Sequence, residues 1–245
     1  YKETERRRTA SDVSVSNACA ITEDGVQVFY RDETQGILLG AVKENDEWRY
    51  EIVDGDRTTD SRTTGDVAFD LAATTVGNSI YLIYDSVLTI DNNRTVTSGE
   101  VRLAIRDNAD FTDWRYRTLD GPDNGNTVSG YAVSISASKN SVIAGWLVAK
   151  ANLLPNPYIL SYAEVSDEGA IFSIAPTNLG VLGSPLSINA DTAAFSCGKR
   201  LCLANEDFST VKLINADLPA LDAGRTLTIS KKQYLAASVN KELVL

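Results

Sequence analysis

The stretch Trp48-Arg-Tyr-Glu-Ile-Val-Asp-Gly55 decides the fold, because it recurs as Trp114-Arg-Tyr-Arg-Thr-Leu-Asp-Gly121. Each copy follows an apolar stretch that begins near a glycine, at residues 36–43 and 99–106. Each copy is followed by polar residues rich in Asp, Thr, Asn and Gly, and then by two further apolar segments. The repeating unit is therefore four strands long, which is the size of one β-propeller blade.

These units predict an all-β protein, most simply a β-propeller of five four-stranded blades. All-β domains often reach 245 residues as one unit, so we expect a single domain over residues 1–245. No segment joins an N-cap to a sustained 3.6-residue apolar period, so helices are not expected. The blades are predicted at residues 12–55, 67–121, 131–174, 185–217 and 226–245, with residues 1–10 closing the last one.

Composition and charge restrict the classes of partner. The chain has a formal net charge of −10, whereas nucleic-acid binding relies on Lys and Arg clusters that displace counterions from phosphates. The basic run Arg6-Arg7-Arg8 is expected to be a solvated terminal arm. Apolar runs stop short of the roughly 18 residues that span a bilayer. We therefore expect neither a nucleic-acid partner nor a membrane span.

Three features bear on the cellular compartment. The sequence begins at Tyr1 and contains no methionine, as in a processed precursor or a trimmed chain. Asn93-Arg-Thr is a glycosylation sequon in a polar loop. Cys197 and Cys202 are expected to lie opposite each other across a turn and form a disulfide, and Cys19 to be a buried free thiol in an apolar strand. Together they predict a secreted, extracellular protein with a disulfide.

Aromatic residues of the repeat are candidates for ligand binding. Trp48 and Trp114 stand at equivalent positions, and Tyr50 and Tyr116 follow two residues later. Equivalence by repeat favours packing between blades for the tryptophans, with a sugar-stacking platform as the alternative. An aromatic ring with a polar tip can serve either purpose.

The lack of histidine limits the catalytic chemistry. Ser-His and Cys-His nucleophile systems and histidine-based metal sites are excluded, which leaves carboxylate chemistry such as glycoside hydrolysis. Asp66 and Asp70 on one first strand, Asp191 on another and Glu23 at a turn are the acids placed to converge. Solvated or turn-forming Asp is the competing interpretation for each.

Calcium is the one cofactor considered. The stretches Asp54-Gly-Asp56 and Asp120-Gly-Pro-Asp-Asn-Gly-Asn126 are rich in oxygen ligands, although neither follows the EF-hand pattern. No metal site is otherwise predicted.

Two blades resemble the fungal fucose-binding lectin propellers, whose repeats pair a short strand of Val-x-Val-Tyr type with a later Trp. The counterparts here are Val26-Gln-Val-Phe-Tyr30 with Trp48, and Ile80-Tyr-Leu-Ile-Tyr84 with Trp114. The resemblance implies a propeller that recognises carbohydrate.

The lectins grip their sugar with an Arg in the first of these strands and a Glu in the next. Gln27 and Tyr81 occupy the first place, so the sugar-gripping set does not carry over. The sequence therefore predicts a secreted recognition propeller with a glycan or a surface protein as partner. A carboxylate glycoside hydrolase and a protein-binding or structural propeller are the alternatives.

Overall fold

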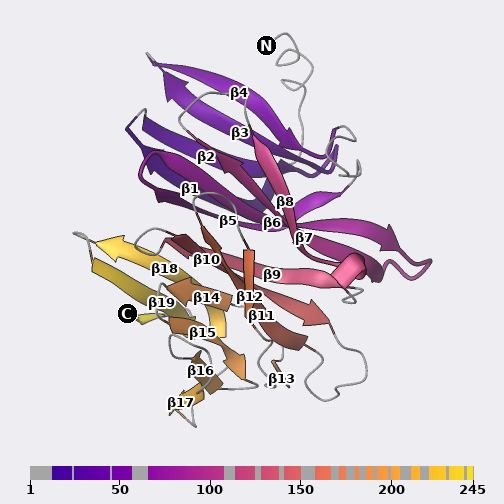
Figure 1. The fold of residues 1–245 in the computed structure, drawn as a ribbon, viewed down its shortest axis with the longest axis vertical. Coiled ribbons are helices and arrows are strands. Elements are labelled where there is room, and N and C mark those ends of the chain that lie inside the picture. The colour runs from indigo at the N-terminus through magenta and orange to yellow at the C-terminus, as the bar shows by residue number, and fades with distance from the viewer. Residues whose placement is uncertain are drawn as a thin grey trace. The chain divides into compact units, whose positions relative to one another are not determined.

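A computed structural model gives an all-β chain, drawn in Figure 1. The chain divides into two compact units, residues 1–127 and 128–245. Side chains are described only between residues 16 and 165, and beyond residue 166 the strands alone are described. The described backbone before that point covers residues 13–23, 25–44, 46–56, 66–107, 114–124, 128–137, 141–149 and 158–166.

The described residues of the first unit form two four-stranded antiparallel sheets, and consecutive strands are neighbours in each. The first sheet contains β1 (Val13–Thr22), β2 (Gly25–Asp32), β3 (Ile37–Glu44) and β4 (Glu47–Asp54). The second contains β5 (Val67–Val76), β6 (Ser79–Ile90), β7 (Val96–Arg106) and β8 (Arg115–Asp120), followed by the short 3-10 helix η2 (Pro122–Asn124).

Strands β1 and β5 lie side by side, so the two sheets share one apolar core (Figure 1). Phe29 and Leu38 of the first sheet are buried with Leu82 and Tyr84 of the second. Trp114 packs against this core and meets the Phe29 ring edge-on, with 5.8 Å between ring centroids. Burial of these side chains removes apolar surface from water and holds the sheets together.

Buried ion pairs also connect the two sheets. Arg102 Nη1 lies 2.9 Å from Asp54 Oδ2, and the same oxygen accepts a 2.8 Å hydrogen bond from the Tyr84 hydroxyl. Arg106 Nη1 lies 2.6 Å from Glu51 Oε1. Burial raises the pKa of the Glu51 carboxyl, and Arg106 opposes that shift. Each buried charge has an opposite partner, as a desolvated charge requires.

The Asp-Gly of the repeat has the same local role in both copies. The Asp54 carboxylate accepts a hydrogen bond from the Gly55 N–H at 2.8 Å, and that of Asp120 accepts one from Gly121 at 2.9 Å. Gly55 has φ = 101°, in the left-handed region that favours glycine. Gly121 has no such φ, but a Cβ added there would lie 2.8 Å from the Glu100 Cβ, so glycine is needed for its φ in the first copy and for a close contact in the second.

The second unit contains three more antiparallel sheets among the described residues. They have the orders β12-β11-β10-β9 (with β13 beside β11), β14-β15-β16-β17 and β18-β19-β20. Their strands are β9 (Ser129–Ala137), β10 (Ser141–Ala149), β11 (Tyr158–Ser166), β12 (Ile171–Ile174), β13 (Gly180–Val181), β14 (Leu186–Asn189), β15 (Thr192–Cys197), β16 (Arg200–Ala204), β17 (Val211–Asn215), β18 (Leu221–Ile229), β19 (Lys232–Val239) and β20 (Glu242–Val244). The prediction that residues 1–10 close the last blade concerns a segment outside the described residues. This closure and the number of blades stay predictions.

Two predictions about cysteines need correction. Cys19 has no disulfide, but it is exposed rather than buried, because it falls on the outward side of β1 next to buried Ala20. Cys197 is paired with Arg200, and Cys202 with Phe195, so the two cysteines are offset by two residues instead of lying opposite each other. Their side chains lie outside the described set, and the disulfide stays a prediction.

Within the described residues, no helical segment combines the length and apolar character that a membrane crossing requires.

Candidate functional site

A bulge near the start of β5 forms the centre of the candidate site. Val67 pairs with Ser86 and Leu71 pairs with Tyr84, so residues 68–70 face the single residue Asp85. Because three residues of β5 face one residue of β6, some backbone N–H and C=O groups of β5 lack the hydrogen-bond partners that a regular ladder provides. Bulges of this kind redirect side chains and are frequent next to active sites.

The same bulge occurs in three successive sheets. In β1, residues 14–16 face Arg31, and in β9, residues 130–132 face Leu147. The residue that faces the bulge is thus cationic in the first sheet, acidic in the second and apolar in the third. The acidic version alone brings two carboxyl groups to one bulge, Asp85 from β6 and Asp70 from β5.

Backbone strain distinguishes the β5 bulge. Ala68 has φ = 61°, whereas the equivalent residue of β9 is Gly130 with φ = 90°. A left-handed conformation costs an L-residue about 1–2 kcal/mol, a cost that glycine avoids. Strained residues persist where their surroundings fix them, and they cluster at functional sites.

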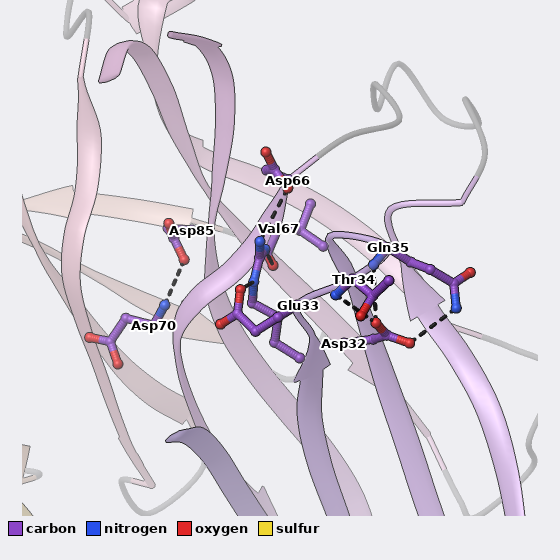
Figure 2. A network of polar contacts seen from close by, with 9 residues as sticks. Asp32, Glu33, Thr34, Gln35, Asp66, Val67, Asp70 and Asp85 are labelled. Carbon is purple, nitrogen blue, oxygen red and sulfur yellow. Dashed lines mark hydrogen bonds and ion pairs between the residues drawn. The ribbon is translucent and has the colours of Figure 1, made fainter. Parts of the chain in front are cut away.

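Asp70 and Asp85 lie together but in different surroundings. The Asp70 N–H donates to Asp85 Oδ1 at 2.8 Å, and the Leu71 N–H donates to Asp70 Oδ1 at 3.1 Å. Figure 2 shows the Asp70 carboxylate turned away from that of Asp85. Asp85 is 7% exposed, whereas Asp70 is half-buried. Burial, together with the nearby Asp70 charge, raises the pKa of Asp85 from 3.8 to about 7, although the Asp70 N–H and Arg31 favour its charged form.

Arg31 reaches from the first sheet to the β5 bulge. Its Nη2 lies 3.1 Å from Asp66 Oδ1, its Nη1 donates to the Val67 carbonyl, and its Nε lies 2.9 Å from Glu33 Oε2. The guanidinium carbon lies 3.6 Å from the centre of the Phe69 ring. Arg31 is 2% exposed, so a fully engaged guanidinium fixes this end of β5.

The turn between β2 and β3 supports these contacts. Asp32 Oδ1 accepts hydrogen bonds from the Thr34 and Gln35 N–H groups at 2.9 and 3.0 Å (Figure 2). The turn ends at Gly36, whose carbonyl accepts the Val67 N–H at 3.0 Å. The turn of the first sheet thereby anchors the beginning of β5.

The structure brings together only some of the predicted acids. Asp66 and Asp70 lie at the start of β5, as expected. Glu23 lies at the other end of the strands, because its N–H donates to Asn78 Oδ1 in the turn after β5. The expectation that Glu23 converges with the other acids is wrong. Asp191 lies outside the described residues.

Two of the four aromatic residues predicted to bind ligand make hydrogen bonds within the fold, and ligand binding by all four stays a prediction. The Trp114 N–H donates to Glu51 Oε2 at 3.1 Å, and the Tyr116 hydroxyl donates to the Val53 carbonyl at 2.6 Å, so both are used within the fold. Trp48 is 46% exposed and Tyr50 half-buried. Packing, expected for both tryptophans, is therefore observed for Trp114 and not for Trp48.

Two further predictions concern modification and metal binding. Asn93 is exposed, as a glycosylation acceptor must be, and its glycosylation stays a prediction. No three acidic or thiol side chains among the described residues come together as a metal site. In the two loops considered for calcium, Asp54 is already paired with Arg102, and Asp120 binds the Gly121 N–H.

The sequence interpretation missed Arg31, Phe69 and Asp85. A usable signal was present, because Arg31 and Asp85 each follow a tyrosine in the second strand of their repeats. Aligned there, the repeats show a charged residue at a strand position expected to be apolar. Phe69 had no such signal, because its exposure depends on the bulge.

The arrangement favours acid–base chemistry. A carboxyl group whose surroundings raise its pKa can act as a general acid near neutral pH. Asp85 keeps its proton up to a pH near 7, and half-buried Asp70 lies beside it.

Comparison with solved structures identifies the fold. The GH32 beta-fructofuranosidase BmSUC1 of Bombyx mori is similar with a TM-score of 0.53 and 12% identity, over 93% of this chain and 54% of that chain. A mutant of that enzyme in complex with sucrose gives a TM-score of 0.52 and 12% identity, over 95% and 57% of the two chains. The chain thus spans about half the length of the Bombyx mori enzyme. No protein-family model and no curated protein matches the sequence.

These similarities confirm the predicted fold class and correct the predicted family. The chain has an all-β, β-propeller fold. The similar structures reported above are glycoside hydrolases rather than fucose-binding lectins, so the propeller part of the resemblance is supported and the lectin family is not.

Proposed function

We propose that this protein hydrolyses glycosides, with Asp70 and Asp85 as its two reacting carboxyl groups. The observation that carries the proposal is the hydrogen bond from the Asp70 backbone N–H to the Asp85 carboxylate at the strained β5 bulge, which brings a residue with a buried carboxyl of raised pKa next to one with a half-buried carboxyl. Glycoside hydrolases generally use two such carboxyl groups, one as general acid and one as nucleophile or general base.

The two residues have different roles in this proposal. Asp85 is protonated below a pH of about 7 and donates its proton to the leaving oxygen. Asp70, whose carboxylate is half-buried and turned away from Asp85, acts on the sugar carbon or on a water molecule. Arg31 holds the start of β5, and with it the bulge, in position.

The fold is compatible with this role. The similar Bombyx mori protein is a beta-fructofuranosidase, and the blades of a propeller surround a central channel where residues of several blades can meet. Sucrose therefore belongs among the first substrates to test. Glycan binding without hydrolysis is the competing outcome, and an extracellular location is part of the proposal.

Hydrolysis of nitrophenyl glycosides and of sucrose, measured on the wild type, Asp70→Asn and Asp85→Asn, tests the proposal. Either substitution keeps the side-chain shape and should lower kcat by about 10²–10⁴-fold. Asp46→Asn is the matched control, because Asp46 is an exposed turn residue with φ = 67°, which asparagine tolerates. It should leave the rate unchanged.

The dependence of the hydrolysis rate on pH provides a second test. Because Asp85 must be protonated, the rate should fall as the pH rises through about 7. Absence of hydrolysis in the wild type, or equal rates in all four proteins, would reject the proposed function.

A further inference from the structure

We infer that Phe69, backed by Arg31, is the platform on which the apolar face of a neutral sugar ring stacks. The inference rests on the proposed function, because it takes the ligand to be a sugar that binds at the bulge that also holds Asp70. Phe69 has a large apolar side chain, yet it is 45% exposed, whereas Ala68 and Leu71 on the same strand are buried.

The ring is held before any ligand arrives. The Arg31 guanidinium carbon lies 3.6 Å from the ring centre, and Arg31 is fixed by Asp66, Glu33 and the Val67 carbonyl. An aromatic group that is already ordered loses little conformational entropy on binding. The bulge adds to this order, because residues 68–70 are held against Asp85.

The neighbouring charges select the type of sugar. The side chains of Asp66 and Glu33 are 44% and 37% exposed, so each can accept hydrogen bonds from sugar hydroxyls. With Asp70 they outnumber the single guanidinium, which is itself buried. An anionic sugar would meet net negative charge, whereas a neutral sugar offers C–H groups to the ring and hydroxyls to the acids.

Substitution of Phe69 separates stacking from simple burial. Phe69→Leu keeps an apolar side chain but removes the aromatic face, and should raise KM and the dissociation constant for neutral oligosaccharides about tenfold. Phe69→Trp keeps a platform and should bind within about twofold of the wild type. Trp48→Leu is the matched control, since Trp48 is equally exposed (46%) but lies in β4, and it should change neither constant.

Binding should be measured on a panel of neutral oligosaccharides and on the corresponding uronic-acid oligosaccharides, with KM from the nitrophenyl glycosides. Weaker binding of the uronic acids by the wild type is expected. The inference is wrong if Phe69→Leu binds like the wild type, if Phe69→Trp is as weak as Phe69→Leu, or if Trp48→Leu alone loses binding.

The outcomes distinguish this inference from the proposed function. Hydrolysis with an unchanged KM in Phe69→Leu would reject the platform and leave the function. Glycan binding that Phe69→Leu abolishes, in a protein without hydrolysis, would reject the function and leave the platform.

Discussion

The carboxylate of Asp85 accepts the backbone N–H of Asp70 at 2.8 Å, at the point where three residues of β5 face one residue of β6. This side-chain contact replaces a backbone bond that the bulge removes from the ladder. Structure and proposed chemistry thus depend on the same carboxyl group, since burial at the bulge also raises the pKa of Asp85 to about 7.

Asp85→Asn should change how stability depends on pH. The folded pKa of about 7 lies above the ordinary value of 3.8, so between these values the folded protein holds a proton that the unfolded chain has lost. The wild type should therefore lose on the order of 1.4 kcal/mol of unfolding free energy per pH unit relative to the variant, as the pH rises from about 4 to 7. Urea denaturation at several pH values measures this difference. Parallel curves for the two proteins would contradict a raised pKa.

Ala68→Gly should not destabilise the protein, although glycine normally weakens a strand. Relief of the left-handed strain at φ = 61° should raise the unfolding free energy by about 1–2 kcal/mol. The greater conformational entropy of glycine in the unfolded state should lower it by about 0.5–1 kcal/mol. The expected result is a gain between zero and about 1.5 kcal/mol. Ala72→Gly, in the regular part of β5 opposite Ile83, is the control and should lose stability. Equal losses at the two positions would show that Ala68 is unstrained.

The repeat made the fold predictable because its residues have local and recurring roles. Asp54 and Asp120 each bind the N–H of the following residue, so an Asp recurs where the fourth strand ends in this way. Strand periodicity then placed the turns, because each apolar run must pair with its neighbour.

The site was predictable only in part, because it depends on contacts between sheets. Asp66 and Asp70 were found as acids on a first strand. The bulge adds two residues to β5 relative to β6, and a regular alternation of side chains does not reveal it. Arg31 belongs to the neighbouring sheet, so its contact with Phe69 has no signature along the chain.

Gly36→Ala should disturb both stability and the site. A Cβ at Gly36 would come closer than 3.0 Å to the Asp66 carboxylate, which also pairs with Arg31. Gly77→Ala is the matched control, because Gly77 has a similar φ (59° against 68°) but no atom within 4 Å of an added Cβ. Both variants carry the left-handed penalty of about 1–2 kcal/mol.

Thermal or urea denaturation should show a larger loss for Gly36→Ala, and hydrolysis should fall in that variant alone. Equal losses of stability with unchanged activity would mean that Asp66 moves aside without effect on the site.

Trp48→Phe and Trp114→Phe should have unequal effects despite their equivalence in the repeat. Trp114 donates to Glu51 at 3.1 Å, and the Arg106 guanidinium lies 4.4 Å from its ring. Phenylalanine cannot donate, so this substitution should cost about 1–2 kcal/mol. Trp48 is 46% exposed, and its replacement should change stability by less than about 0.5 kcal/mol.

Urea denaturation of the two variants at neutral pH measures the difference. The cost at Trp114 should shrink in a Glu51→Gln background, because the indole then loses a charged acceptor. Glu51 is the acceptor for Trp114 and not for Trp48, so Trp48→Phe should change the unfolding free energy by the same amount in both backgrounds. If the two substitutions lowered the unfolding free energy equally, Trp48 would be packed like Trp114. The two tryptophans would then be equivalent in their surroundings as well as in sequence.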